Sequence, residues 1–166
     1  MIFLAQKSQG IVSNRLTLIR KVSSRTTVRA GVAVIPHRRD GAFLIERRAD
    51  CGLWGLVGGK MNPGETVRQT ACRECREETG LFFKPERLLG IYSNPSGRLI
   101  RFVPSGDERH ILDIVLIGTC RGKLVKSPES AELAWFTRGH MPSRRDFLRA
   151  AWEPLQDYLL GKSSFF

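Results

Sequence analysis

Three glutamates lie close together in the middle of the sequence, at positions 74, 77 and 78. Residues three and four apart are neighbours on a helix surface, so on a helix Glu74, Glu77 and Glu78 form one acidic stripe. Arg73 stands four residues before Glu77 and can pair with it, whereas Glu74 and Glu78 have no basic partner at helical spacing. A solvated surface can tolerate these two carboxylates. A hard divalent cation such as Mg²⁺ or Mn²⁺ would bind them.

The glycines before this stretch favour the cation over the solvated surface. Gly58 and Gly59 are adjacent, and Gly64 follows Pro63. Without a Cβ atom, a glycine lets main-chain groups approach a metal ion or a phosphate closely. We therefore expect a glycine-containing loop to lie against the acidic stripe.

The same stretch has the end signals of a helix. Thr66 is a suitable N-cap, residues 67–79 contain neither glycine nor proline, and Gly80 is a typical C-terminal stop. These signals predict a helix that places the three glutamates on one element.

Read from Gly59, the stretch is glycine, five residues, Glu65, seven residues, and then Arg73-Glu74-Cys75-Arg76-Glu77-Glu78-Thr79-Gly80-Leu81. It resembles the Nudix box, and eight of the nine defined positions match; Cys75 stands where the box usually has an aliphatic residue. The likeness also covers the segment 43–59 and Ala134-Trp135-Phe136, so that it extends over about residues 28–137.

The resemblance implies a fold and a reaction. The fold is the Nudix α/β/α sandwich of the α/β class, with a mixed β-sheet between helices. The reaction is Mg²⁺-dependent hydrolysis of a diphosphate bond in a nucleoside diphosphate-linked substrate, either ADP-ribose-like or a nucleoside triphosphate, by attack of water at phosphorus.

The resemblance also implies residue roles. The metal ligands are the side chains of Glu74, Glu77 and Glu78 and the main-chain carbonyl of Gly58. The residues that hold the loop and the helix in shape are Glu65 and Arg73. A general base is also needed. The family uses either a glutamate of the box, here Glu77, or an acid from a later loop, here Glu129 or Glu132.

Four residues outside the box are candidates for substrate contacts: Arg48, Trp54, Arg98 and Arg101. Arg48 matches a family arginine that can contact phosphate, and bracing the loop is the alternative. Trp54 can stack on a base or pack under the loop. Arg98 and Arg101 belong to the segment 93–110, a long predicted loop of the kind that often carries function, so we expect this segment to determine substrate choice.

The chain of 166 residues has 27 Lys and Arg against 16 Asp and Glu, a net charge of +11. Such a charge attracts polyanions, although a solvated basic surface explains it equally well. We expect a nucleotide-like small molecule as the partner, with RNA as an alternative and a homodimer as one compatible assembly. There are two alternatives to hydrolysis of a small nucleotide. The protein is then either an RNA 5′-end pyrophosphohydrolase or a non-catalytic Nudix domain that senses nucleotides.

The cysteines favour packing over metal binding. Cys72 and Cys75 have the C-x-x-C spacing, but a structural zinc site needs a second ligand pair at the usual spacing. On the predicted helix we therefore expect them to pack against the core. The free thiols, together with an apolar run at residues 2–5 that is too short for a signal or a membrane span, predict a cytoplasmic protein without a membrane partner.

The rest of the chain predicts one catalytic domain, residues 27–162, after a basic extension, residues 1–26, that contains a short helix at residues 12–20. Strands are expected at 28–36, 42–46, 88–92, 111–119 and 132–136. A second helix is expected at 146–160, and loops at 51–60 and 93–110.

Overall fold

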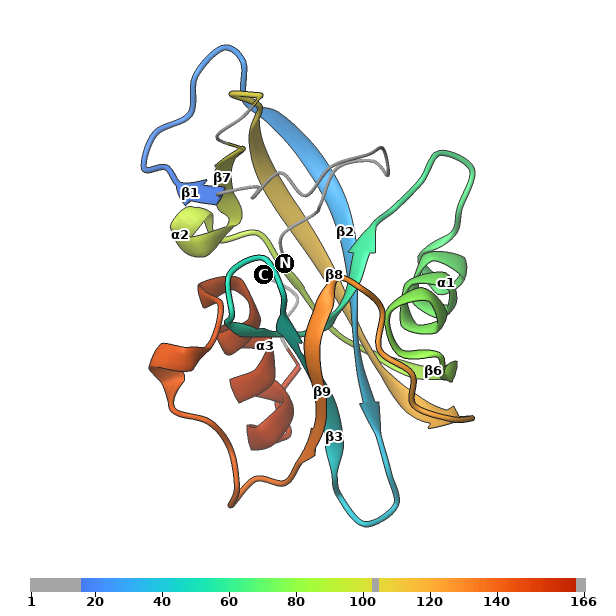
Figure 1. The fold of residues 1–166 in the computed structure, drawn as a ribbon. Coiled ribbons are helices and arrows are strands. Elements are labelled where there is room, and N and C mark those ends of the chain that lie inside the picture. The colour runs from blue at the N-terminus through green and yellow to red at the C-terminus, as the bar shows by residue number, and fades with distance from the viewer. Residues whose placement is uncertain (1–15, 103–104, 164–166) are drawn as a thin grey trace.

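The computed structural model describes residues 16–102 and 105–163. A strongly curved mixed sheet lies between two long helices, α1 (Val67–Thr79) and α3 (Arg149–Leu160), which cover opposite faces (Figure 1). This arrangement confirms the predicted α/β class and the sheet between helices.

The sheet contains nine strands in the described part of the chain. They are β1 (Leu16–Leu18), β2 (Thr27–His37), β3 (Phe43–Arg48), β4 (Trp54–Gly55), β5 (Val57–Lys60), β6 (Phe82–Tyr92), β7 (Leu99–Phe102), β8 (Glu108–Arg121) and β9 (Ser130–Phe136). The long strands β2 and β8 pair in parallel, from Thr27 opposite Arg109 to His37 opposite Thr119, and all other pairs are antiparallel. The mixture of directions is what the resemblance implies.

The buried run of β2 explains why both faces of the sheet are covered. Ala33 and Ile35 pack into the core under α3, whereas Val32 and Val34 pack into the core under α1. Successive side chains of a strand point to opposite faces, so a continuous apolar run requires a cover on each side.

Helix α1 begins and ends where the sequence predicts. The Thr66 side chain accepts from the backbone of Gln69, the Gln69 side chain accepts from the backbone of Thr66, and Gly80 ends the helix with φ 72°. Cys75 is fully buried in the core under α1, and Cys72 is half-buried, with its thiol 3.4 Å from the Phe83 carbonyl oxygen. The prediction that the cysteines of α1 face the core is therefore confirmed for Cys75 and holds in part for Cys72.

The predicted helix at residues 12–20 is wrong for its described part. Residues 16–18 form β1, which pairs with β7 from Leu16 opposite Phe102 to Leu18 opposite Ile100. Residues 12–15 lie outside the described residues. The spacing of Val12, Leu16 and Ile19 suggested a helix, but Leu16 and Leu18 also fit the two-residue period of a strand, and pairing with β7 satisfies their backbone.

The two predicted loops contain more strand than expected. Residues 51–60 include β4 and β5, and β5 pairs with β2. Residues 93–110 include a kinked turn, α2 (Pro95–Arg98), all of β7 and the beginning of β8. Sheet partners distant in sequence impose this structure on segments whose Gly and Pro content indicated loops.

The C-terminal helix begins later than predicted. A short 3-10 turn, η1 (Arg144–Asp146), precedes α3, which starts at Arg149. None of the helices in the described ranges is both long and apolar enough to cross a lipid bilayer.

Candidate active site

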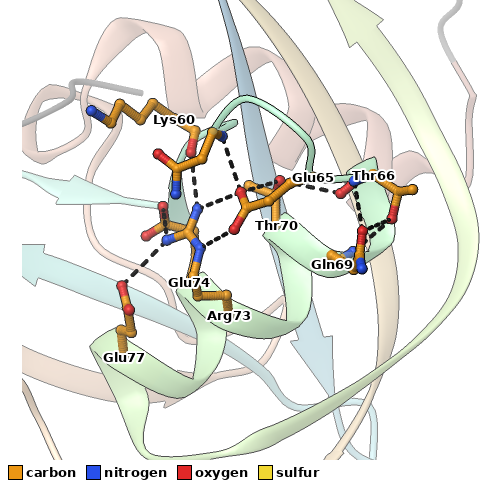
Figure 2. A network of polar contacts seen from close by, with 9 residues as sticks. Lys60, Glu65, Thr66, Gln69, Thr70, Arg73, Glu74 and Glu77 are labelled. Carbon is orange, nitrogen blue, oxygen red and sulfur yellow. Dashed lines mark hydrogen bonds and ion pairs between the residues drawn. The ribbon is translucent and has the colours of Figure 1, made fainter.

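Arg73 and Glu65 join helix α1 to the loop that precedes it (Figure 2). The Arg73 Nε atom donates to Glu65 Oε1 at 2.6 Å, and Nη2 donates to Oε2 at 2.9 Å. Nη2 also donates to the Lys60 carbonyl oxygen at 3.1 Å, so that the end of β5 is held by the same guanidinium. Two parallel charge-assisted bonds fix the orientation of both side chains.

Glu65 also accepts hydrogen bonds from the loop and from the helix. Its Oε2 atom accepts from the Asn62 N–H at 3.0 Å and from the Thr70 hydroxyl at 2.9 Å. Arg73 and these donors hold the pKa of the Glu65 carboxyl well below its usual range. Glu65 is therefore ionised at neutral pH and braces the loop, the role that the resemblance implies for it.

Glu78 lies at the interface between α1 and β5. It is 7% exposed, and its Oε2 atom accepts from the Gly58 N–H at 2.7 Å. Burial raises the pKa of the Glu78 carboxyl well above its usual value, and the nearby Glu46 carboxylate raises it further. A cation would favour the ionised form at this position.

Glu74 lies directly against Gly59. A Cβ atom added at Gly59 would be 2.1 Å from Oε1 of Glu74, so a larger residue there would displace the Glu74 carboxylate from this position. The same oxygen accepts from Arg73 Nη1 at 2.7 Å. Burial raises the pKa of the Glu74 carboxyl, and Arg73 counteracts this in part.

Glu77 is on the outer side of the stripe. Its side chain is 62% exposed and lies 3.3 Å from Arg73 Nη1, which confirms that Arg73 can pair with it. Glu74 and Glu78 are thus buried against the glycines, whereas Glu77 faces solvent. In the described part of the chain, no three carboxylate, imidazole or thiol side chains converge on one point.

Glu46, which sequence reasoning missed, is a third buried carboxylate and lies next to Glu78. It lies on β3, is 1% exposed, and accepts from the Ser130 hydroxyl at 3.1 Å. Its carboxyl hydrogen-bonds that of Glu78, and burial raises its pKa. The signal in the sequence was a lone glutamate that follows the apolar residues Phe43, Leu44 and Ile45 in a strand.

The segment between β8 and β9 approaches the C-terminal end of α1. The Val125 N–H donates to the Thr79 carbonyl oxygen at 2.8 Å, and the Ser127 N–H donates to that of Glu78 at 3.1 Å. Glu129 follows these anchors, and its charge raises the pKa of Glu74. Glu132 instead lies on β9, where its carboxylate is 3.8 Å from Arg47. Of the two later acids, Glu129 is the one electrostatically linked to the acidic stripe.

Arg48 and Trp54 are both buried. Arg48 is 5% exposed and pairs with Asp50 through two hydrogen bonds of 2.9 and 3.0 Å. Trp54 is 7% exposed, and its ring meets that of Phe136 edge to face at a centroid distance of 5.1 Å. These contacts support the bracing role for Arg48 and the packing role for Trp54.

Arg98 and Arg101 are engaged with protein carboxylates. Arg98 is 1% exposed and donates to Asp113 at 3.1 Å and to Glu153 at 2.8 Å. Arg101 is half exposed, and its Nε atom donates to Glu108 at 3.0 Å. The structure therefore places Arg98 in the core and Arg101 at an ion pair on β7, and it does not bring either to the acidic stripe.

The chain is similar in sequence to proteins that are named as nucleotide phosphatases and pyrophosphatases. The chain is 34% identical over 119 residues to the human 8-oxo-dGDP phosphatase NUDT18, a match that covers 68% of this chain and 33% of that protein. It is 36% identical over 108 residues to an ADP-ribose pyrophosphatase of Methanocaldococcus jannaschii, covering 63% of this chain and 59% of the relative. The chain therefore spans from a third to about three fifths of these relatives.

The crystal structure of a MutT NUDIX hydrolase from Burkholderia pseudomallei superposes with a TM-score of 0.63 at 25% identity, covering 78% of this chain and 97% of that one. The family model of the NUDIX domain matches residues 27–159. Because that match includes the whole glycine loop, α1 and the segment carrying Glu129, the chain belongs to the Nudix hydrolase family.

Proposed function

We propose that this protein hydrolyses a diphosphate bond in a nucleoside diphosphate derivative with the help of Mg²⁺. The observation that carries the proposal is a set of three buried carboxylates. Glu78 is bonded to the Gly58 N–H, Glu74 lies against Gly59, and Glu46 lies next to Glu78. Burying an ionised carboxylate is costly unless a counter-charge compensates it. Arg73 compensates Glu74 only in part, and the pKa of each of the three carboxyls is raised.

The donors in this cluster fit Mg²⁺. They are hard oxygen ligands, and Gly59 has no Cβ atom that would push Glu74 away. Glu74, Glu77 and Glu78, with the Gly58 carbonyl, would hold the ion, and Mn²⁺ has the same preference for oxygen. When bound, the cation neutralises the diphosphate and lowers the pKa of the attacking water.

The protein residues divide the remaining tasks. Glu65 and Arg73 keep the loop and α1 in register, and the Gly58 N–H orients Glu78. Glu77 reaches into solvent, where a substrate phosphate can approach. Glu129 is the preferred general base, because its segment is hydrogen-bonded to the end of α1 through Ser127 and its charge acts on Glu74. Glu77 is the alternative.

We infer that the substrate is a small nucleotide, either an ADP-ribose-like molecule or a nucleoside di- or triphosphate. The names of the relatives support both, since one relative is an ADP-ribose pyrophosphatase and another an 8-oxo-dGDP phosphatase. The net charge of +11 favours RNA 5′-end pyrophosphohydrolysis as a second candidate. A sensor without catalysis is disfavoured because the carboxylates of the stripe are all present.

A substrate panel tests the proposal. Purified protein is incubated with ADP-ribose, dinucleoside polyphosphates, dGTP, 8-oxo-dGTP and 5′-triphosphorylated RNA, with Mg²⁺ or with EDTA. We expect EDTA-sensitive release of a nucleoside monophosphate from one of the small nucleotides. Cleavage in EDTA would refute the metal assignment, and no cleavage of any substrate with Mg²⁺ would refute the enzymatic function.

A further inference from the structure

An exposed aromatic ring stands next to the acidic stripe, at the first residue of β6. Phe82 is 53% exposed, although large apolar side chains are normally buried. It comes three residues after Thr79, the last residue of α1, and it lies opposite Arg121 of β8 in the strand pairing. Two clefts meet at this ring, one of about 540 Å³ and the other of about 530 Å³.

Basic side chains line both clefts. The first contains Arg68, Lys84 and Arg121, and the second contains Arg76, Lys123 and Lys126. Within the described residues none of these six cations forms an ion pair with a carboxylate. They come from α1, β6, β8 and the segment after β8, so the concentration of charge results from the fold and not from one run of sequence.

Two guanidinium groups lie near the Phe82 ring. The Cζ atom of Arg76 is 4.0 Å from the ring centroid, and that of Arg121 is 5.7 Å away. Arg76 is held in place because its Nη1 atom donates to the Gly80 carbonyl oxygen at the end of α1. Unpaired bases stack on aromatic rings and on guanidinium planes, and basic side chains bind the phosphates of the nucleic-acid backbone.

The second cleft continues to the acidic stripe, because Glu77 lines it together with Lys123 and Lys126. A chain bound along both clefts would therefore have one end at Glu77, the exposed carboxylate of the stripe. We propose that Phe82 and the six cations form a binding surface for single-stranded RNA, here called the Phe82 surface.

Two features favour RNA over an anionic membrane. The cations line concave clefts, each of a size that can hold a nucleotide, whereas a lipid surface needs a protruding face. Among the described residues, only two large apolar side chains of these clefts, Phe82 and Val125, are exposed, too few for insertion into lipid.

Binding without turnover tests the proposal, because it is independent of the proposed hydrolysis. A fluorescent, unphosphorylated single-stranded RNA of about twelve nucleotides is titrated with the full chain in EDTA, at several salt concentrations, with anisotropy as the readout. We expect Phe82→Ala to weaken binding at least about fivefold, the effect of losing one base stack. Phe82→Leu preserves apolar bulk and should weaken binding similarly.

Charge variants separate specific binding from general attraction. Replacing Arg121 and Lys123 by Gln should flatten the slope of log Kd against log salt by about 0.7 for each phosphate that is no longer neutralised. The matched control replaces two exposed arginines beside α3, Arg144 and Arg145, by Gln; it removes the same charge and should retain the steep slope.

Three results would overturn the proposal. The first is equal RNA affinity of the Phe82 variants and the control, with thermal melts showing that all are folded. The second is tighter binding of an RNA duplex than of the single strand. The third is binding to phosphatidylserine vesicles in the absence of RNA binding. Loss of hydrolysis with intact RNA binding would instead count only against the proposed function.

Discussion

The amide nitrogen of Gly58 lies 2.7 Å from Oε2 of Glu78 and donates a hydrogen bond to it. This contact connects β5 to α1 and fixes one carboxylate of the stripe. The donor favours the ionised form of Glu78, whereas burial and the Glu46 carboxylate favour the protonated form, and together the latter two dominate. Under the proposed function, a bound cation would reverse that balance.

Replacing Glu78 by Gln removes the charge while an amide oxygen can still accept from Gly58. We expect Mg²⁺-dependent turnover to fall at least about a hundredfold, since metal ions contribute several kcal/mol to such reactions. Circular dichroism should show an intact fold. The matched control is Glu86→Gln on β6, which alters an exposed ion pair with His37. Full turnover of the Glu78 variant would contradict the metal assignment.

Stability without metal should fall as pH rises. Burial raises the pKa of Glu46 and Glu78, so between the unfolded pKa and the folded pKa the native state binds more protons than the unfolded chain. The free energy of unfolding therefore decreases with pH over that window. We expect Tm in EDTA to fall as the pH is raised from about 5 to about 8. Added Mg²⁺ should raise Tm more at the higher pH than at the lower one.

The control for this experiment is Glu46→Gln, which removes one of the two coupled carboxyls. It should reduce the drop of Tm with pH. A Mg²⁺ effect that is equal at both pH values would argue against binding of the ion to these carboxylates.

Local signals explain which parts of the site were predictable. Thr66 and Gly80 are the ends of α1, and the spacing of the glutamates then follows from helix geometry. Glu46 was missed because its role depends on Glu78 and Ser130, which are distant in sequence. No local pattern distinguishes a buried carboxylate in a strand from an exposed one.

Arg98 shows why the segment 93–110 was misread as a loop. Pro154 has no N–H, so the Ala150 carbonyl, four residues earlier in α3, lacks its helical partner. Arg98 Nη2 donates to that carbonyl at 2.9 Å. This bond uses a carbonyl that a proline 56 residues away leaves without a partner. The local sequence shows only an arginine among Pro, Gly and Ser, which is typical of a loop.

Glu65→Gln should destabilise the protein at neutral pH and progressively less as the solution is acidified. The pKa of Glu65 is lowered in the fold, so its contribution is present above the unfolded pKa and is lost as pH falls through the folded pKa. We expect a loss of about 1–3 kcal/mol at pH 7, the range for charge-assisted hydrogen bonds. Urea unfolding at about pH 7 and about pH 3 measures both values.

Arg73→Lys, which cannot form the two parallel bonds, should show a loss of similar size. A loss that is the same at both pH values would contradict the assigned role.

Arg98→Met should lower the free energy of unfolding by about 3–5 kcal/mol, because it removes the partner that Arg98 provides to the buried Asp113 carboxylate. Arg101→Met, at a half-exposed ion pair, should cost at most about 1 kcal/mol. Chemical denaturation compares the two variants. If Arg98→Met left stability unchanged and raised only KM, Arg98 would instead be a substrate contact.

The identity of the general base can be tested by comparing Glu129→Gln with Glu132→Gln. Glu129 acts electrostatically on Glu74, whereas Glu132 pairs with Arg47 on β9. We therefore expect kcat to fall about 10²-fold or more for Glu129→Gln, with loss of the acidic limb of the pH–rate profile, and to fall far less for Glu132→Gln.

Mg²⁺ affinity, measured by calorimetry, should change little in either variant, which distinguishes a general base from a metal ligand. If Glu77→Gln removed the acidic limb while Glu129→Gln retained it, the base would lie on α1, and the segment after β8 would serve only to cover the end of that helix.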